Sequence, residues 1–161
     1  MSTTAARPTT GRFTPTKLFR AVAITEAITW TLLLIGMFLK YVTETTELGV
    51  RVFGMLHGIA FVAYCVVTVV VAVDRRWSAG RAMLALFCAI PPLATVPFER
   101  RAVKQGWLGD SWRLPEGAGT SAPDRTIAWL LRNPVRGAAV GAAVVAGLTL
   151  IALIVGPPFQ K

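Results

Sequence analysis

The sequence has few of the residues that build most metal and redox centres. Its 161 residues include one histidine, His57, and two cysteines, Cys65 and Cys88. This set cannot supply the ligands of a zinc site or two histidines for a haem, so we expect no cofactor of its own. Both cysteines lie within apolar stretches, so a disulfide framework of the secreted kind is not expected either.

Charged residues are also scarce. They make up 16% of the chain, whereas a soluble domain usually carries about 25%. Hydrophobic residues make up 54%, and the mean hydropathy is +0.58. Because a domain of roughly 150 residues buries only about 70% of its surface, so much apolar surface cannot be hidden from water. The composition excludes a water-soluble globule and predicts a multi-pass protein of the cell membrane.

The charges that are present are mostly basic, with 17 Lys and Arg against 8 Asp and Glu. A sequence pI near 10.8 would suit a nucleic-acid-binding protein. However, the basic residues lie in the N-terminal tail and between long apolar blocks, which is their usual place in membrane proteins. We therefore expect lipid and other membrane subunits as partners, and no nucleic acid.

Four apolar blocks predict an all-α membrane protein with four transmembrane helices in a small bundle. The blocks are residues 19–41, 52–73, 81–98 and 137–155. The first is about 30 Å long as a helix, which matches the hydrocarbon thickness. The third is the shortest and contains Pro91, Pro92 and Pro97, so its helix must kink or break. A re-entrant path for this block is the alternative to a full span.

The same pattern divides the chain into four parts. Residues 1–17 form a polar, basic N-terminal tail, and residues 18–104 form a three-helix membrane domain. Residues 105–136 form a loop rich in Trp, Gly and Pro, and residues 137–161 form the fourth transmembrane helix with a short tail. Within the loop, Asp124 is suited to N-cap an amphipathic helix that extends to Arg132 along the membrane interface.

Lys and Arg do not decide the topology on this scheme. With four spans and a cytoplasmic N-terminus, eight of them fall inside and nine outside. A re-entrant third block would place fourteen inside and three outside, which is the distribution that the positive-inside rule prefers. We retain four spans with the N-terminus in the cytoplasm, and this imbalance is the main argument against them.

Glu26 is the most informative polar residue, because a carboxylate within a span costs at least about 2.5 kcal/mol and usually faces protein or water. It either fixes helix packing or titrates as part of a proton or ion site. Depth estimates along the helices place Tyr64 near Glu26, and place His57 nearer Thr95 and about 12 to 14 Å from Glu26. We favour intramembrane polar packing for Glu26, His57 and Tyr64, with no catalytic and no metal-binding residue.

Small residues mark one possible contact face in the last apolar block. Gly137 and Gly141 form a G-x-x-x-G pattern, and Gly147 follows four residues after Ala143. Such a ridge lets the backbone of another helix approach closely. We therefore interpret Gly137, Gly141 and Gly147 as a helix-contact face.

Several short motifs resemble an actinobacterial family of integral membrane proteins, known as domain of unknown function 3817. The resemblance covers about residues 17–104, and it implies no catalytic residue. The motifs are Phe19-Arg20, Glu26-Ala27, Leu32 to Met37, Lys40-Tyr41, His57-Gly58, Phe61, Tyr64, Trp77, Pro91 and Phe98 to Arg101.

The whole chain also resembles the respiratory supercomplex association factors of mycobacteria, which are accessory subunits of the cytochrome bcc–aa3 assembly. This resemblance implies a non-catalytic subunit of the respiratory electron-transport chain that contributes to assembly or stability. Haem and copper are then expected only in partner subunits such as those of cytochrome c oxidase. The alternative is an independent, oligomeric membrane carrier or sensor in which Glu26 titrates.

Overall fold

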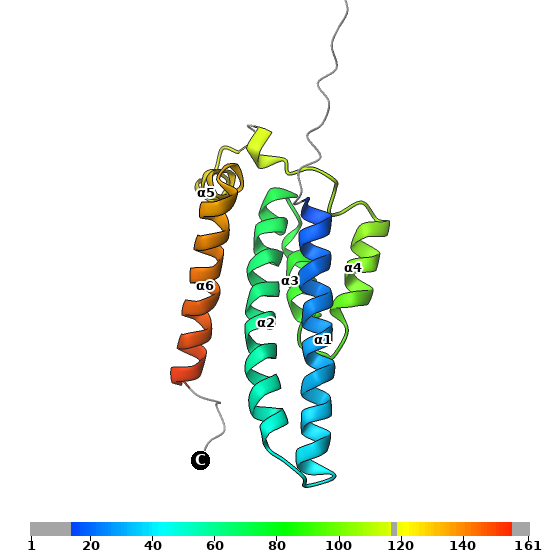
Figure 1. Cartoon of the computed structure of the whole chain (residues 1–161). Coiled ribbons are helices and arrows are strands. Elements are labelled where there is room, and N and C mark those ends of the chain that lie inside the picture. Colours follow the sequence, from blue (N-terminus) through cyan, green and yellow to red (C-terminus); the bar gives the residue numbers. More distant parts are fainter. Residues whose placement is uncertain (1–13, 117–118, 156–161) are drawn as a thin grey trace, which may run out of the picture.

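The computed structural model describes residues 14–116 and 119–155, and all regular structure in these ranges is helical (Figure 1). Met1 to Phe13 of the expected tail and Gly156 to Lys161 lie outside the described residues. The elements are α1 (Pro15–Tyr41), α2 (Leu48–Asp74), α3 (Ala79–Phe87), α4 (Thr95–Lys104), the short 3-10 turn η1 (Leu114–Glu116), α5 (Ala122–Arg132) and α6 (Pro134–Val155).

Three of these helices are long and apolar enough to cross a membrane. Helices α1 and α2 have 27 residues each and α6 has 22. At a rise of 1.5 Å per residue they extend over about 40, 40 and 33 Å, which exceeds the hydrocarbon thickness of about 30 Å. The chain is a multi-pass membrane protein with three candidate spans among its described residues.

The expectation that the third apolar block spans the membrane is wrong, because this block forms two short helices. Helix α3 has 9 residues and α4 has 10, so each is only about 15 Å long. Pro91 and Pro92 have no N–H with which to continue α3. Leu93 then adopts a left-handed conformation with φ 64°, and the chain reverses before α4. Pro97 is tolerated because it lies in the first turn of α4.

Helices α3 and α4 form a hairpin that enters the bundle and returns to the end from which it came (Figure 1). Glu99 on α4 pairs with Arg20 near the start of α1, with 2.7 Å between Oε1 and Nε. Beyond α4, the Thr16 hydroxyl donates to the carbonyl oxygen of Gly109 at 2.7 Å. Both contacts place the loop after α4 beside the start of α1, as the re-entrant alternative requires.

Helices α1 and α2 approach each other closely where two glycines meet, near the loop that joins them. A Cβ atom on Gly36 would lie 2.7 Å from the carbonyl carbon of Gly49, and one on Gly49 would lie 3.0 Å from the Cα of Gly36. Small residues permit this backbone contact between membrane helices. The antiparallel α1–α2 pair is the frame on which the α3–α4 hairpin and α6 are placed.

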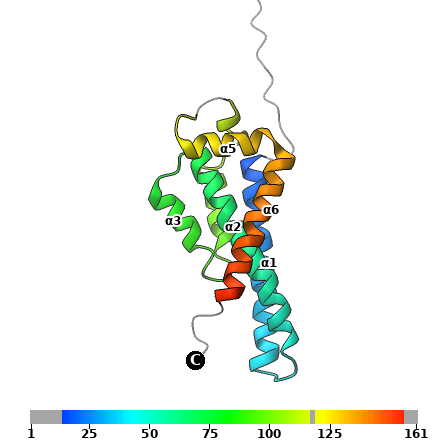
Figure 2. The same ribbon diagram turned by 90° about the vertical axis from the view of Figure 1, so that its left-hand side faces the viewer.

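Helix α5 lies across the end of the bundle, and α6 descends from it (Figure 2). The N-cap of α5 is Ser121, whose hydroxyl accepts from the backbone N–H of Asp124 in a capping box. The expectation that Asp124 is the N-cap is therefore wrong: Asp124 is the N3 residue, and its carboxylate accepts in return from the Ser121 N–H. The expected helix itself is present, and it ends at Arg132.

Candidate functional site

Glu26 is completely buried between α1 and α4. The hydroxyl of Thr95, the first residue of α4, donates to Oε2 of Glu26 at 2.5 Å. The same hydroxyl lies 3.2 Å from the carbonyl oxygen of Ala23. The other carboxyl oxygen, Oε1, has no hydrogen-bond partner among the described residues. Glu26 therefore joins the first span to the turn of the α3–α4 hairpin.

His57 belongs to α2 and faces α1 about one turn beyond Glu26, at the level of Thr29. Its Nδ1 atom is 3.2 Å from the Thr29 hydroxyl, which is also 2.9 Å from the backbone carbonyl oxygen of Glu26. The rings of His57 and Trp30 pack with their centroids 4.4 Å apart. The depth estimate placed Thr95 beside His57, but Thr95 lies beside Glu26. The estimate for Thr95 was wrong because it treated residues 81–98 as one span. The estimate that His57 lies 12 to 14 Å from Glu26 was also wrong, because the Thr29 hydroxyl lies within hydrogen-bond distance of both His57 Nδ1 and the Glu26 carbonyl oxygen.

Tyr64 is fully buried, and it joins α2 to helix α3 of the hairpin. Its hydroxyl donates to the carbonyl oxygen of Ala85 on α3 at 2.9 Å. Its ring packs against Phe19 of α1, with the centroids 5.5 Å apart. Glu26, His57 and Tyr64 thus each bridge two elements.

An aromatic cluster closes the bundle at the end where α1 begins. Phe19, Trp77 and Phe98 pack with ring centroids 5.9 to 6.1 Å apart. The indole N–H of Trp77 donates to the carbonyl oxygen of Trp107 at 2.9 Å. Trp77 is only 8% exposed, so its ring packs inside the bundle rather than against lipid. Its partners lie on elements that sequence spacing could not bring together.

Asp74 is a structural residue that the sequence analysis missed. It is completely buried at the end of α2, and its carboxylate accepts from the backbone N–H groups of Leu114 at 2.9 Å and Arg113 at 3.3 Å. Nε of Arg113 donates back to the Asp74 carbonyl oxygen at 2.6 Å. Asp74 thereby attaches η1 to the second span. The sequence signal was an acid directly after an apolar block.

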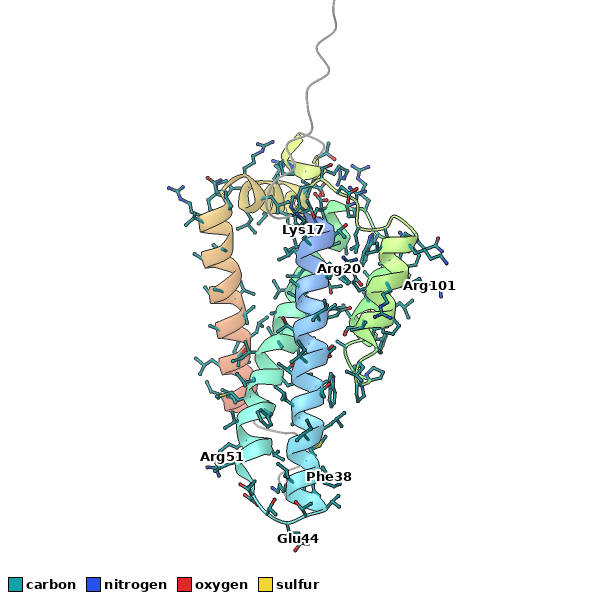
Figure 3. The ribbon with its side chains drawn as sticks, turned by 45° about the vertical axis from the view of Figure 1, so that its right-hand side comes forward. Lys17, Arg20, Phe38, Glu44, Arg51 and Arg101 are labelled. Atoms are coloured by element: carbon teal, nitrogen blue, oxygen red, sulfur yellow. The ribbon has the colours of Figure 1, made fainter. Side chains whose placement is uncertain are left out.

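Basic residues gather at the same end of the molecule. Figure 3 shows Lys17, Arg20 and Arg101 toward this end, and Arg51 and Glu44 at the other. Of the fourteen Lys and Arg in the described ranges, only Lys40 and Arg51 lie near the loop between α1 and α2. The other twelve are Lys17, Arg20, Arg75, Arg76, Arg81, Arg100, Arg101, Lys104, Arg113, Arg125, Arg132 and Arg136.

The three glycines of the expected contact face have different surroundings. A Cβ on Gly137 would lie 2.4 Å from the carbonyl oxygen of Leu130, so this glycine serves the close turn between α5 and α6. Gly141 is half-buried and Gly147 is exposed, and neither would bring a Cβ within 4 Å of another group. Of these three glycines, Gly147 is therefore the one that is exposed.

Within the part of the chain that the structure describes, no three His, Cys, Asp or Glu side chains are grouped as metal ligands. Cys65 and Cys88 are both free thiols and half-buried. The described polar side chains can hold helices together by hydrogen bonds and ion pairs. The fold and this arrangement define a helical multi-pass membrane protein whose spans are joined by buried polar contacts.

Residues 16–104 match the family described as domain of unknown function 3817, and the chain belongs to this family. The match covers α1, α2 and the α3–α4 hairpin, and it ends with the last residue of α4. The family resemblance found in the sequence is therefore confirmed. Helices α5 and α6 lie outside the matched segment.

A protein of Streptomyces coelicolor that is named as a membrane protein is similar to this chain. The two are 46% identical over 108 residues, which is 66% of this chain. The chain spans only 12% of the length of that relative. No solved structure matches the chain.

Proposed function

We propose that this protein is a non-catalytic accessory subunit of a larger membrane complex, where it contributes to assembly or stability. We further propose that the complex is the actinobacterial cytochrome bcc–aa3 respiratory supercomplex. The choice of this complex rests on the resemblance of the whole chain to supercomplex association factors. On this proposal the protein has no cofactor of its own, and haem and copper belong to its partner subunits.

The observation that carries the docking role is the exposure of α6. None of its 22 residues is buried by the rest of the chain, although the helix has the composition of a membrane span. Lipid tails are as apolar as leucine, so a small-residue surface gains most from close contact with another helix. The exposed surface of α6 around Gly147 and Ala143 offers such a contact to a partner subunit.

The buried polar residues support a scaffolding role within the subunit. Glu26 joins α1 to α4 through Thr95, His57 joins α2 to α1 through Thr29, and Tyr64 joins α2 to α3. These contacts keep the family segment in one shape. A fixed shape is what a docking subunit must present to its partner, because binding then requires little reordering.

We propose that the end where α1 begins faces the cytoplasm. Twelve of the fourteen described Lys and Arg residues lie at that end, and cytoplasmic loops of membrane proteins carry such an excess. Helix α5 then lies along the cytoplasmic surface. The loop between α1 and α2, which contains Glu44 and Glu47, faces the opposite side.

The proposal is tested by purifying the tagged protein from its native membranes in a mild detergent. We expect it to be recovered with haem-bearing subunits, as measured by haem absorbance and by the identity of the co-purified chains. Gly147→Leu adds bulk to the exposed face of α6 and should remove most of the recovered haem. Gly80→Leu, at another exposed glycine with open space beside it, is the matched control. Recovery of the wild type only as a small protein without haem would contradict the proposal.

A further inference from the structure

An apolar groove runs along the outside of α2 between α3 and α6. Its wider part has a volume of about 630 Å³ and is lined mainly by α2, α3 and α6, with Leu86, Phe87 and Leu148 among its walls. This volume lies within the range of roughly 300–1,000 Å³ that is usual for ligand sites. In Figure 2, α2 lies between α3 and α6.

A second cavity continues the groove toward the basic end of the molecule. It has a volume of about 350 Å³ and shares Val69 and Leu86 with the first. Its far wall contains Arg76 and Trp77, just beyond the end of α2. Along α2 from Phe61 to Val73, the groove is about 18 Å long. This length corresponds to one leaflet, which is about half of the 30 Å hydrocarbon layer.

The charge in this groove is confined to its polar end, where Arg76 is exposed. No other described residue makes a hydrogen bond or an ion pair with the Arg76 side chain. By contrast, the Arg81 guanidinium lies over the Trp107 ring at 4.2 Å, and Arg75 Nη1 donates to the Ser111 carbonyl oxygen. Arg76 is therefore the arginine that remains available to a ligand in the groove.

The backbone at Arg76 is itself unusual. Its φ is 51°, and the backbone N–H groups of Arg76 and Trp77 bond to the carbonyl oxygens of Val73 and Ala72. This pattern is a Schellman motif with Arg76 at the left-handed position, where glycine is the usual residue. The positive φ costs an arginine more than it would cost a glycine. A role for the Arg76 side chain would explain why arginine stands at this position.

We propose that the groove binds an anionic phospholipid of the surrounding leaflet. One acyl chain lies between α2, α3 and α6, and the phosphate pairs with the Arg76 guanidinium. The walls favour an acyl chain over a transmembrane helix, because they carry long side chains such as Met83, Phe87 and Ile90. Close helix contacts in membranes instead require small residues. A guanidinium pairs well with phosphate because its planar donors fit the phosphate oxygens.

The test uses the full chain, delipidated in a neutral detergent and offered either phosphatidylglycerol or phosphatidylcholine with identical acyl chains. Bound lipid is counted by native mass spectrometry. We expect the wild type to retain phosphatidylglycerol in preference to phosphatidylcholine. Arg76→Gly should lower the affinity for phosphatidylglycerol by about fivefold, the effect of one basic residue beside an anionic lipid. Because glycine is favoured at this backbone position, the variant should fold at least as well as the wild type.

Two further variants make the test specific. Arg100→Gln removes an exposed arginine that does not line the groove, and it should leave lipid binding unchanged. Leu86→Trp fills the segment shared by the two cavities, and it should lower the binding of both lipids. Equal losses for Arg76→Gly and Arg100→Gln would show only a general attraction to basic surface and would overturn the proposal. So would the absence of a lipid preference in the wild type, or a dimer of this chain that Leu86→Trp dissociates.

Discussion

Replacing Gly36 by alanine tests how closely α1 and α2 must approach. The new Cβ would lie 2.7 Å from the carbonyl carbon of Gly49 and 2.9 Å from the backbone nitrogen of Val50. Non-bonded carbon atoms prefer about 3.5–4.0 Å, so one helix must move by roughly 1 Å. The obstructing atoms belong to the backbone and cannot turn aside. We expect a cost of about 1–3 kcal/mol, as for other overpacked sites.

The matched control is Gly58→Ala on α2, where nothing lies within 4 Å of the new Cβ. Both variants gain about 1 kcal/mol of helix propensity, so their difference isolates the contact between α1 and α2. At about 2–4 °C per kcal/mol for a chain of this size, Gly36→Ala should unfold several degrees below Gly58→Ala. Thermal unfolding in mild detergent, followed by intrinsic fluorescence, measures this. If Gly36→Ala is as stable as the control, the close approach of the two helices is refuted.

Three more predictions concern Glu26, the α5 cap and the topology. Glu26→Gln should leave the stability nearly unchanged, and Glu26→Leu should lower the free energy of unfolding by only about 0.6 kcal/mol. The loss is small because the Thr95 hydroxyl can donate to the Ala23 carbonyl oxygen instead. A severe and equal loss of respiration in intact complexes of both variants would instead support proton relay by Glu26. The hydrogen bond from Ser121 lowers the pKa of Asp124 in the folded protein. The ionised Asp124 carboxylate therefore stabilises the fold fully above the pKa of an unfolded aspartate, about 3.9. This stabilisation disappears as the pH falls through the lower pKa of the folded state. Thermal unfolding should therefore depend less on pH between about 6 and 3 in Asp124→Asn than in the wild type, and equal pH dependence would contradict this. With the two native cysteines replaced by serine, single cysteines at Asp110 and Glu44 should react with an impermeant thiol reagent from opposite sides of the membrane, and reaction from the same side would contradict the three-span topology.

The three spans could be predicted from length and hydropathy, because a membrane imposes both on any helix that crosses it. The path of residues 81–98 could not. Pro91 and Pro92 predict a break in the helix, but a break is compatible with a kinked span and with a hairpin. The choice depends on tertiary contacts such as the ion pair between Arg20 and Glu99, which joins residues that are far apart in sequence.

The buried site was only partly predictable for the same reason. The sequence identified Glu26 as a residue that must be shielded from lipid, and it is completely buried. Its partner Thr95 could not be found, because the depth of Thr95 follows from the hairpin rather than from a straight third span. The role of Trp77 also depends on the hairpin, since its hydrogen bond reaches Trp107 beyond α4.

Photo-crosslinking in native membranes tests whether this chain docks on a haem-bearing complex through α6. A photoreactive amino acid at Ile151, a large side chain that is 57% exposed one turn beyond Gly147, places the probe on the same surface of α6 without adding bulk at the glycine. We expect a light-dependent crosslink to a subunit of the cytochrome bcc–aa3 assembly, identified by mass spectrometry. Crosslinks only to lipid or to a second copy of this chain would contradict it.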